Sequence, residues 1–239
     1  MISTGTAACL PAAEPIEGIT IAGVSGWTTT VSNGSFGLGS GEPVDAVMHR
    51  WATLQHELAD LGARRLATGV QVHGDSVTTH GGEWWGWLRQ RDIDGHATKV
   101  RGTALAVTVA DCTPVFIAHP TAIALLHAGW RGTAANILQR GLEAMMQLGC
   151  APDECQIHLG PSICVGCYEV GPEVIRAVTG RPASAKGFLD VRQVLAEQAG
   201  SFGVRIITTS AWCTRCGGGR FFSHRAGDTG RQLGILALL

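Results

Sequence analysis

One stretch of the sequence, residues 104–139, restricts the fold more than any other part of the chain. Short apolar runs in it predict three strands, at 104–110, 115–118 and 122–126. Pro114 separates the first two runs, because proline cannot donate a ladder hydrogen bond from the middle of a sheet. Apolar residues then recur at helical spacing after Thr133, which predicts a helix with Thr133 as its N-cap.

Potential metal ligands stand where the predicted strands end. Cys112 follows the first strand, His127 follows the third, and an earlier short strand at 69–74 leads to His73. Two imidazoles and one thiolate suit zinc, and a site with three protein ligands keeps a position for water or substrate. The alternative is that the histidines are surface residues and the cysteine is a core residue. The spacing alone leaves both interpretations open.

Five motifs carry a resemblance to a known family. They are QVHG at 71–74, ADCTPV at 110–115, HAGWRGT at 127–133, GPSICVGCYEVG at 160–171 and FFSHR…TGR at 221–231. From about Val70 to its last residue the chain resembles the bacterial laccase-domain family, also called polyphenol oxidases or peptidoglycan-editing factors. The resemblance implies zinc ligands and catalytic residues at His73, Cys112 and His127, the same set that donor chemistry selects.

The resemblance also implies an activity and an architecture. The implied activity is that of a purine nucleoside phosphorylase acting on inosine or adenosine with phosphate, with adenosine deaminase and methylthioadenosine phosphorylase side activities. The implied fold class is α+β: one domain over residues 1–239, built as an α/β/β/α sandwich of mixed sheets with helices on the outer faces. The sequence further predicts a hairpin at 18–31, helices at 42–62, 170–179 and 189–200, and strands at 156–159 and 204–210.

Substrate-binding residues are expected on both sides of the metal ligands. Arg131 and the N–H groups of Gly132 and Thr133, at a predicted helix start, suit a bound anion. Ser35 begins the segment Ser-Phe-Gly-Leu-Gly, which keeps the frame of a family motif. His224 and Arg225 lie in the segment that the resemblance implies closes on the substrate; the alternative is a solvated basic loop.

The N-terminal part departs from the family pattern in two places. The family usually has an arginine in the hairpin, whereas residues 19–34 contain none, and Gly37 stands where the family usually has asparagine. The resemblance places that arginine near substrate or phosphate, so its loss bears on phosphorolysis but not on the metal ligands.

Three further features allow two interpretations each. Asp94 is either a support for the metal ligands or a turn cap. The indoles of Trp84, Trp85 and Trp87 either pack on a sheet or form an aromatic wall for a base. Two CxxC pairs are either buried thiols, which we favour, or a four-cysteine zinc site; their separation far exceeds the ~15–20 residues of a zinc ribbon. The pairs are Cys164 with Cys167 and Cys213 with Cys216.

Composition excludes several classes of partner. The chain is 45% apolar and 15% charged, which permits a sizeable core, and its net charge of −1 gives no electrostatic reason to bind nucleic acid or an anionic membrane. No apolar run reaches the ~18 residues of a membrane span. Residues 1–15 lack the basic start of a secretory signal, so we expect a cytoplasmic monomer whose eight cysteines are thiols or metal ligands.

Three alternatives to a zinc phosphorylase follow from the same residues. Two histidines and one cysteine also match a blue-copper site, and the older family name implies a copper oxidase. A multicopper oxidase, however, needs a further histidine-rich cluster, and the nine histidines of this chain include no His-x-His pair. The second alternative is a metal-free hydrolase or deamidase with Cys112 as nucleophile, activated by His127 or His73. The third is a non-enzymatic cell-wall editing or binding role.

Overall fold

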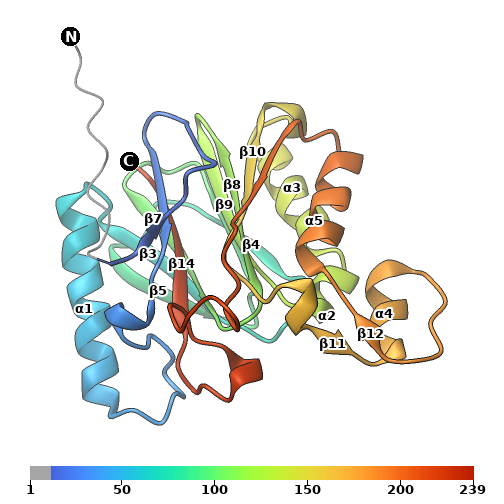
Figure 1. The fold of residues 1–239 in the computed structure, drawn as a ribbon. Helices are drawn as coiled ribbons and strands as arrows, with labels where there is room; N and C mark the ends of the chain where they lie inside the picture. The colour runs from blue at the N-terminus through green and yellow to red at the C-terminus, as the bar shows by residue number, and fades with distance from the viewer. Residues whose placement is uncertain (1–11) are drawn as a thin grey trace.

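Two mixed sheets stacked face to face form the centre of the computed structural model, which describes residues 12–239 (Figure 1). The first six-stranded sheet has the spatial order β1 (Glu14–Pro15), β2 (Val24–Thr28), β14 (Gln232–Leu238), β7 (Thr103–Val109), β3 (Arg65–Val70), β5 (Gly86–Arg91). The second has the order β13 (Ile206–Thr209), β10 (Gln156–Leu159), β8 (Thr113–His119), β9 (Ala122–Ala128), β6 (Gly95–Thr98), β4 (Val77–His80).

Helices cover the outer face of each sheet. The helices of the described residues are α1 (Val44–Asp60), α2 (Trp130–Ala134), α3 (Ile137–Gln147), α4 (Pro172–Thr179) and α5 (Val191–Ser201). Helix α4 packs against α2 and α5 and lies off the sheets (Figure 1). Helix α1 lies alone on the first sheet, and α3 and α5 lie on the second, at the opposite side of the molecule (Figure 1). A small ribbon of β11 (Glu169–Val170) and β12 (Gly187–Phe188) stands beside α4.

Apolar side chains fill all three interfaces between these four layers. The inner faces of the sheets meet through fully buried residues of β7, β8, β9 and β14, among them Leu105, Phe116, Leu125 and Leu236. The α1 interface contains two large aromatic rings, since Trp51 of the helix stacks on Trp87 of β5 with ring centroids 4.5 Å apart. The predicted α/β/β/α sandwich is therefore confirmed, and the shared inner layer supports our proposal of one domain.

The pairing of the strands brings the three candidate metal ligands to one edge of the molecule. Strand β3 runs parallel to β7, with Arg65 opposite Thr103, so the segments that follow the two strands leave the first sheet at the same end. One segment carries His73 and the other carries Cys112. Strand β9 of the second sheet ends at Ala128 and presents His127 at the same edge.

Three local predictions are wrong. Residues 18–31 contain one strand, β2, which pairs with β1 and with β14 and forms no hairpin of its own. Thr133 lies inside α2, where its hydroxyl donates to Gly129 O (2.9 Å), and the long helix α3 starts after Asn136 in a left-handed conformation. Pro114 belongs to β8, one position past the last residue that pairs with β10. Its carbonyl accepts from Gly160 N–H.

Eight other predicted elements occur within a few residues of their expected ends, as α1, α4, α5, β7, β8, β9, β10 and β13. The strand predicted at 69–74 lies earlier, as β3, so His73 stands in the turn after this strand and not on it. Within residues 12–239, no helix combines the length and apolar character that crossing a bilayer requires. Most of the segment that we used to argue against a secretory signal, residues 1–11, lies outside the described part of the chain.

Candidate active site

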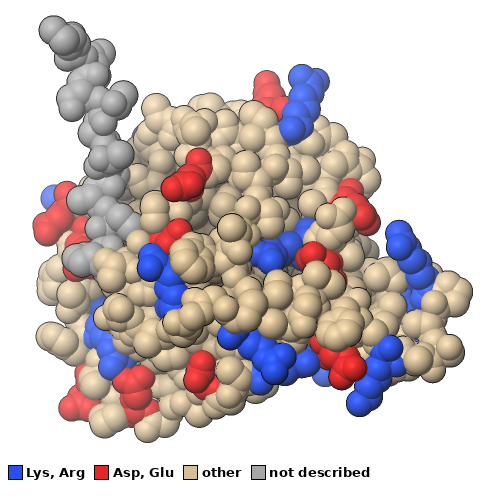
Figure 2. Space-filling view, in the orientation of Figure 1, with Lys and Arg blue, Asp and Glu red and all other residues tan. Residues whose placement is uncertain are grey.

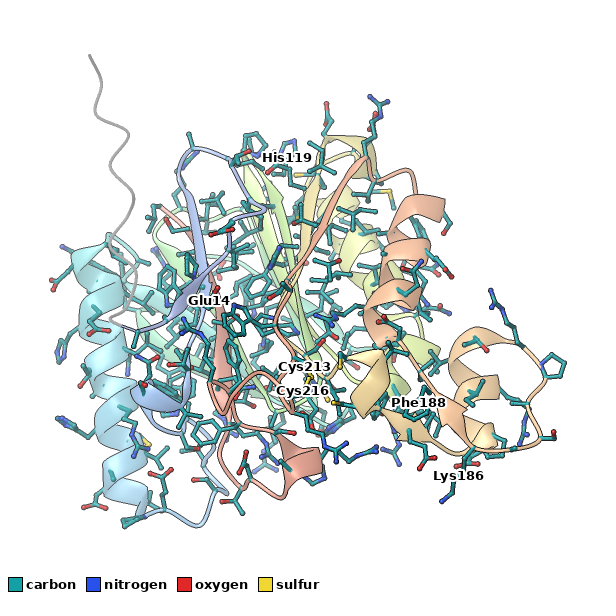
Figure 3. The ribbon with its side chains drawn as sticks, in the orientation of Figure 1. Glu14, His119, Lys186, Phe188, Cys213 and Cys216 are labelled. Carbon is teal, nitrogen blue, oxygen red and sulfur yellow. The ribbon has the colours of Figure 1, made fainter. Side chains whose placement is uncertain are left out.

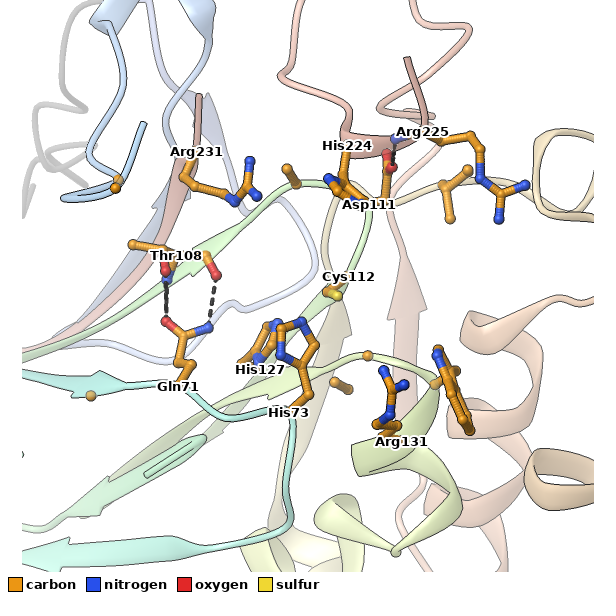
Figure 4. Close-up of a pocket in the computed structure, with 18 of the residues that line it drawn as sticks. Gln71, His73, Thr108, Asp111, Cys112, His127, Arg131, His224, Arg225 and Arg231 are labelled. Atoms are coloured by element: carbon orange, nitrogen blue, oxygen red, sulfur yellow. Dashed lines mark hydrogen bonds between the residues drawn. The ribbon is translucent and has the colours of Figure 1, made fainter. Parts of the chain in front are cut away.

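Three donor side chains that are far apart in the sequence converge at this edge. The ligand atoms of His73, Cys112 and His127 all lie within 4.8 Å of one another. The two imidazole rings meet edge to face, with centroids 4.8 Å apart and planes at 76°. The Cys112 sulfur lies just above them in the close-up (Figure 4). This is the set that the sequence predicted.

A buried carboxylate fixes the position of the two histidines. Asp94 is 0% exposed and accepts hydrogen bonds from the backbone N–H groups of Val72 (3.1 Å), His73 (2.9 Å) and Gly74 (2.9 Å). Its Oδ1 also lies 2.8 Å from His127 Nδ1. These bonds hold His73 in a left-handed conformation (φ 61°), which is uncommon for a residue with a side chain.

The contact between Asp94 and His127 determines which ring nitrogen faces the other donors. A carboxylate can only accept, so Nδ1 carries the proton that it receives, and Nε2 remains for the centre of the site. Burial acts to raise the pKa of Asp94, but hydrogen bonds from His127, Gly74 and Val72 outweigh it and hold that pKa below its usual range. Asp94 is therefore a support for the ligands, beyond a simple turn cap.

The Cys112 thiol is shifted toward its anionic form. Burial acts to raise its pKa, but the positive charge of His127 and hydrogen bonds from His127 and His73 lower the pKa of Cys112 to about 6. Burial likewise acts to lower the pKa of His127, while the Cys112 thiolate and Asp94 raise it to about 9. In the metal-free protein at neutral pH, the two groups form a thiolate–imidazolium pair.

Gly129 leaves the space that the donors occupy. A Cβ atom at this position would lie 3.0 Å from Cys112 Sγ and 3.3 Å from His73 Cδ2. With a side chain there, the Cys112 and His73 side chains would have to move by a few tenths of an ångström, so the glycine of the HAGWRG segment keeps the donors close together. The backbone at Gly129 is extended (φ −82°, ψ 176°), which shows that the constraint is space and not conformation.

A cavity of about 650 Å³ opens directly above the three donors. Its volume lies in the range of small-molecule sites. Basic side chains dominate its polar lining: Arg89, Arg131, His224, Arg225 and Arg231. Lys and Arg side chains gather on the lower half of the face shown in Figure 2, near the loops that precede β14 and β11. The cavity is thus suited to a ligand that carries negative charge.

Two of the cavity arginines already bind main-chain oxygens. Arg225 donates to Glu169 O (2.9 Å) and lies over the Tyr168 ring at 5.1 Å. Arg231 turns back on its own loop and donates to Gly230 O (2.7 Å), with further carbonyls of that loop nearby. These guanidinium groups shape the walls at the same time as they carry charge.

Arg131 differs from them in its partners. Its guanidinium lies over the Trp130 ring, 4.3 Å from the centroid, and within residues 12–239 it forms no ion pair with a carboxylate. In Figure 4 the side chain stands beside His73 and below Cys112, with its head toward the cavity. Of the described arginines, Arg131 is the one best placed to take a ligand anion close to the metal ligands.

Several residues proposed from the sequence lie outside the cavity lining. Gly132 and Thr133 are buried, and Thr133 N–H donates to Gly129 O (2.9 Å), so the expected backbone cradle cannot include Thr133 N–H. Ser35 is buried; its hydroxyl accepts from Gly37 N–H (3.2 Å) and Arg231 N–H (3.0 Å), which connects the 37–40 loop of the cavity to the segment before β14.

The tryptophan-rich turn does not form a wall for a base. Trp87 stacks against α1 and donates to Thr68 Oγ1 (2.8 Å), and Trp84 packs between the sheets near His80. Trp85 is 69% exposed with Arg65 over its ring. None of the three indoles lines the cavity. The interpretation as residues that pack on the sheet is correct for Trp84 and Trp87.

Sequence reasoning missed other lining residues. The Gln71 amide makes a paired contact with Thr108, donating to its carbonyl and accepting from its N–H, both at 2.8 Å. Gln71 begins the QVHG motif and Arg231 ends the last of the five motifs, so their place in these motifs is the sequence signal that could have identified them. Arg89 stands in a strand with no such signal.

Comparison with known proteins agrees with these features. A family model described as "Multi-copper polyphenol oxidoreductase laccase" matches residues 21–239. The chain belongs to this laccase-domain family. It is 36% identical over 183 residues, 70% of this chain and 72% of the relative, to "Purine nucleoside phosphorylase ORF3" of Streptomyces griseus. It is 35% identical over 148 residues, 56% of each chain, to "Adenosine deaminase RL5" of an unknown prokaryotic organism.

The fold of the laccase-domain family is shared as well. The crystal structure of YlmD from Geobacillus stearothermophilus superimposes with a TM-score of 0.82 at 27% identity, over 91% of this chain and 93% of that one. The resemblance found from the five motifs is thus confirmed. In this laccase-domain protein, His73, Cys112 and His127 form a group that is able to hold a metal ion.

Removing the charge of Asp94 tests its role as a support. In Asp94→Asn the amide cannot accept all four hydrogen bonds, so His127 and the His73 backbone lose their fixed positions. We expect the affinity of this laccase-domain site for an added divalent metal ion to fall about 10–100-fold, as for other partners of metal-binding histidines. Competition with a chromophoric chelator measures the change.

Asp92→Asn is the matched control. Asp92 is exposed, lies two residues from Asp94 and has φ 57°, a conformation that asparagine tolerates. We expect unchanged affinity in this variant. Equal affinity in the wild type and Asp94→Asn would contradict the role of the buried carboxylate.

The thiolate–imidazolium pair predicts a pH dependence in the metal-free protein. Only the thiolate reacts with iodoacetamide, and the pKa of Cys112 is lowered to about 6. The rate of Cys112 alkylation, followed by peptide mass spectrometry, should therefore increase with pH and reach half its maximum near pH 6. In His127→Ala the lost positive charge should move this midpoint upward. A wild-type midpoint at the ordinary thiol value of about 8.5 would refute the pairing.

Proposed function

We propose that the protein is a zinc-dependent purine nucleoside phosphorylase for inosine and adenosine, with adenosine deaminase and methylthioadenosine phosphorylase side activities. The observation that carries this proposal is a three-donor metal site that opens into an arginine-lined cavity. The names of the two relatives, one a phosphorylase and one a deaminase, support it.

The donor set fits zinc. His73, Cys112 and His127 supply nitrogen and sulfur ligands, and their spacing of at most 4.8 Å suits donors placed around one ion. Asp94 already fixes the His127 ring as metal sites require. When bound, zinc supplies a Lewis acid for the substrate and an acidified water for deamination.

Phosphorolysis breaks the bond between ribose C1′ and the purine nitrogen and forms a bond from C1′ to a phosphate oxygen, while the purine leaves with a proton. The chain contributes by holding both reactants in one cavity. Arg131 binds the phosphate, since its N–H groups are not engaged by a carboxylate in the described residues. Charge-assisted hydrogen bonds from a guanidinium are strong contacts to phosphate.

The opposite walls contact the nucleoside. His224 and Arg225 come from the C-terminal segment, and Tyr168 and Val191 come from the segment between the two parallel strands β10 and β13. Burial and the negative charge of Cys112 raise the pKa of Tyr168 to about 12, so its phenol stays neutral and is able to donate a hydrogen bond. Arg231 supplies the positive charge that the N-terminal segment lacks.

Gly37 makes room for this arrangement. A Cβ at position 37 would lie 2.9 Å from Arg231 Cγ, so a residue without a side chain allows the Arg231 side chain to cross this wall. Arg231 lines the cavity between the 37–40 loop and Thr229. Gly37, one of the two departures from the family pattern, thus gives space to an arginine that carries positive charge into the cavity.

A metal-free thiol hydrolase is a second candidate that one observation favours. Cys112, His127 and Asp94 form a chain of thiol, imidazole and carboxylate, and the pKa of the thiol is lowered to about 6. Against this candidate, the Cys112 sulfur accepts hydrogen bonds from two imidazoles, those of His127 and His73. A nucleophile needs one base, whereas a zinc ion uses both rings. Zinc bound stoichiometrically and lost in Cys112→Ala would favour the phosphorylase.

Copper oxidation has less support from the ligands. Among the described residues 12–239, the histidines in a group able to hold a metal are His73 and His127, within a single three-donor site. The additional histidine cluster of a multicopper oxidase has no counterpart there. Metal analysis of the purified protein separates zinc from copper.

The activity itself is tested with purified protein, inosine or adenosine, and phosphate, following free base by chromatography. We expect hypoxanthine and adenine to be released only when phosphate is present, together with ribose 1-phosphate. His73→Ala should lose both zinc and nearly all of this activity. His119→Ala is the control, because His119 lies outside the cavity and pairs with Glu154. Zinc-loaded protein that releases no base would refute the reaction and leave the metal site intact.

Arg131→Ala tests the phosphate contact. Losing a hydrogen bond to a charged group costs about 1.5–3 kcal/mol, so we expect the KM for phosphate to rise about 10–150-fold with little change in zinc content. Arg140→Ala is the control: Arg140 lies on α3 outside the cavity and is paired with Asp75 and Glu143 at the surface. An unchanged phosphate KM in Arg131→Ala would assign the phosphate to another arginine.

A further inference from the structure

A second cluster of possible metal ligands lies apart from the three-donor site. It consists of four cysteines from two CxxC pairs: Cys164, Cys167, Cys213 and Cys216. The four side chains are free thiols as expected, but the expected burial is confirmed for Cys213 alone: Cys216 is exposed and the other two are partly exposed. Figure 3 shows Cys213 and Cys216 side by side below the centre of the molecule, between the C-terminal segment and the β11 region.

Strand pairing explains why pairs so distant in the sequence meet. Strands β10 and β13 are parallel neighbours, with Leu159 opposite Thr209, so the two chains leave the sheet together. A bridge between Ser162 and Cys213 continues this pairing, and Thr214 N–H donates to Ser162 O (3.1 Å). The long separation that argued against a zinc site is taken up by the folded segment 168–212.

The four sulfurs have the arrangement of ligands around one ion. They all lie within 4.8 Å of one another, and Cys164 Sγ is 3.9 Å from Cys216 Sγ, too far for a disulfide of about 2.05 Å. The cysteines of both pairs are free thiols in the described residues 12–239. Tetrahedral zinc–thiolate bonds of about 2.3 Å place sulfurs less than 4 Å apart, a spacing that small side-chain adjustments reach.

Backbone groups around Cys213 are organised to stabilise a thiolate. The N–H groups of Cys164 (3.3 Å) and Cys216 (3.4 Å) both donate to Cys213 Sγ. Gly217, directly after the second pair, is needed for this tight turn, because a Cβ there would lie 2.4 Å from Cys213 O. The Arg215 guanidinium, which donates to Cys167 O (3.3 Å), adds positive charge beside the sulfurs.

We propose that Cys164, Cys167, Cys213 and Cys216 hold a structural zinc ion, separate from the ion of the candidate active site. Four thiolates fill a tetrahedral shell and leave no position for substrate, which is the pattern of a structural site. A zinc ion at this place would fix the position of two loops that line the cavity. The ion ties the loop that contains Ile163 and Tyr168 to the loop that leads to His224 and Arg225, and these residues line the cavity.

A second contact shows how this reaches the candidate active site. Thr214, inside the second CxxC pair, donates from Oγ1 to Asp111 Oδ1 (2.6 Å), and Asp111 Oδ2 accepts from Arg225 N–H (2.7 Å). Asp111 precedes Cys112 and has φ 78°. The four-cysteine turn therefore positions the residue before a ligand of the first metal as well as the substrate wall.

Zinc counting tests the proposal on the full-length protein. We expect two zinc ions per chain in the wild type by mass spectrometry of the metal, one in Cys216→Ser and one in His73→Ala. Cys216 is the ligand to change because it is exposed, so its substitution removes a donor without a hole in the core. Cys150→Ala, a buried cysteine outside both groups, is the control and should keep two.

Cobalt substitution identifies the ligands independently. Cobalt in His73→Ala should show the intense charge-transfer and visible bands of a four-thiolate tetrahedral site, and Cys216→Ser should lack them. X-ray absorption of the zinc form of His73→Ala should show only sulfur neighbours at about 2.3 Å. The X-ray absorption measurement needs no variant of the four cysteines, so it tests the proposal even where Cys216→Ser fails to fold.

Three outcomes would overturn the proposal. They are a single zinc in the wild type that Cys216→Ser leaves unchanged, a mass showing a disulfide among the four cysteines, and iron in place of zinc. The proposal does not depend on phosphorylase activity: two zinc ions without phosphorolysis would reject the proposed reaction alone. Phosphorolysis with one zinc, held by His73, Cys112 and His127, would reject the four-cysteine site alone.

Discussion

The carboxylate of Asp94 is the point on which the candidate active site depends. It is fully buried, and it accepts three backbone N–H groups from the turn after β3 together with the His127 ring. A buried charge is costly unless hydrogen bonds satisfy it. Movement of the turn or of the His127 ring would break these hydrogen bonds, so the Asp94 charge holds both in place. One residue thus converts the fold into a fixed geometry for two imidazoles that belong to different sheets.

Parallel strand pairing brings together side chains that are far apart in the sequence. The β3–β7 pair sends His73 and Cys112 to one edge, and the β10–β13 pair sends the two CxxC turns to a common place. In both cases ligands separated by tens of residues meet because parallel neighbours end at the same side of a sheet. The structure uses this device twice, once at the floor of the cavity and once behind its wall.

The sequence allowed prediction of features that are written locally. Helix periodicity located α1, α4 and α5, and donor chemistry near predicted strand ends selected His73, Cys112 and His127 from the sequence alone. Features that depend on a distant partner were missed. Strand β2 pairs locally only with the two-residue β1, and along its whole length with β14, some two hundred residues later, so a hairpin within 18–31 was the natural but wrong inference. The Thr133 N–H was wrongly expected to bind an anion, because this N–H and the Thr133 hydroxyl both bind Gly129 O within one short helix. The spacing rule for zinc ribbons gave no sign that the two CxxC turns meet, since it assumes a short loop between them.

The folded segment 168–212 starts and finishes beside the same four sulfurs, and it carries Tyr168 and Val191 into the cavity. Its two ends are therefore anchored at one place, whatever lies between them. A different segment spliced between the same anchors would present new side chains to the ligand while the floor of the cavity kept its metal ligands. The donors on the floor and the residues of the wall are in this way carried by separable pieces of the chain, so an exchange of segment 168–212 would change which ligand fits the cavity without touching the three donors.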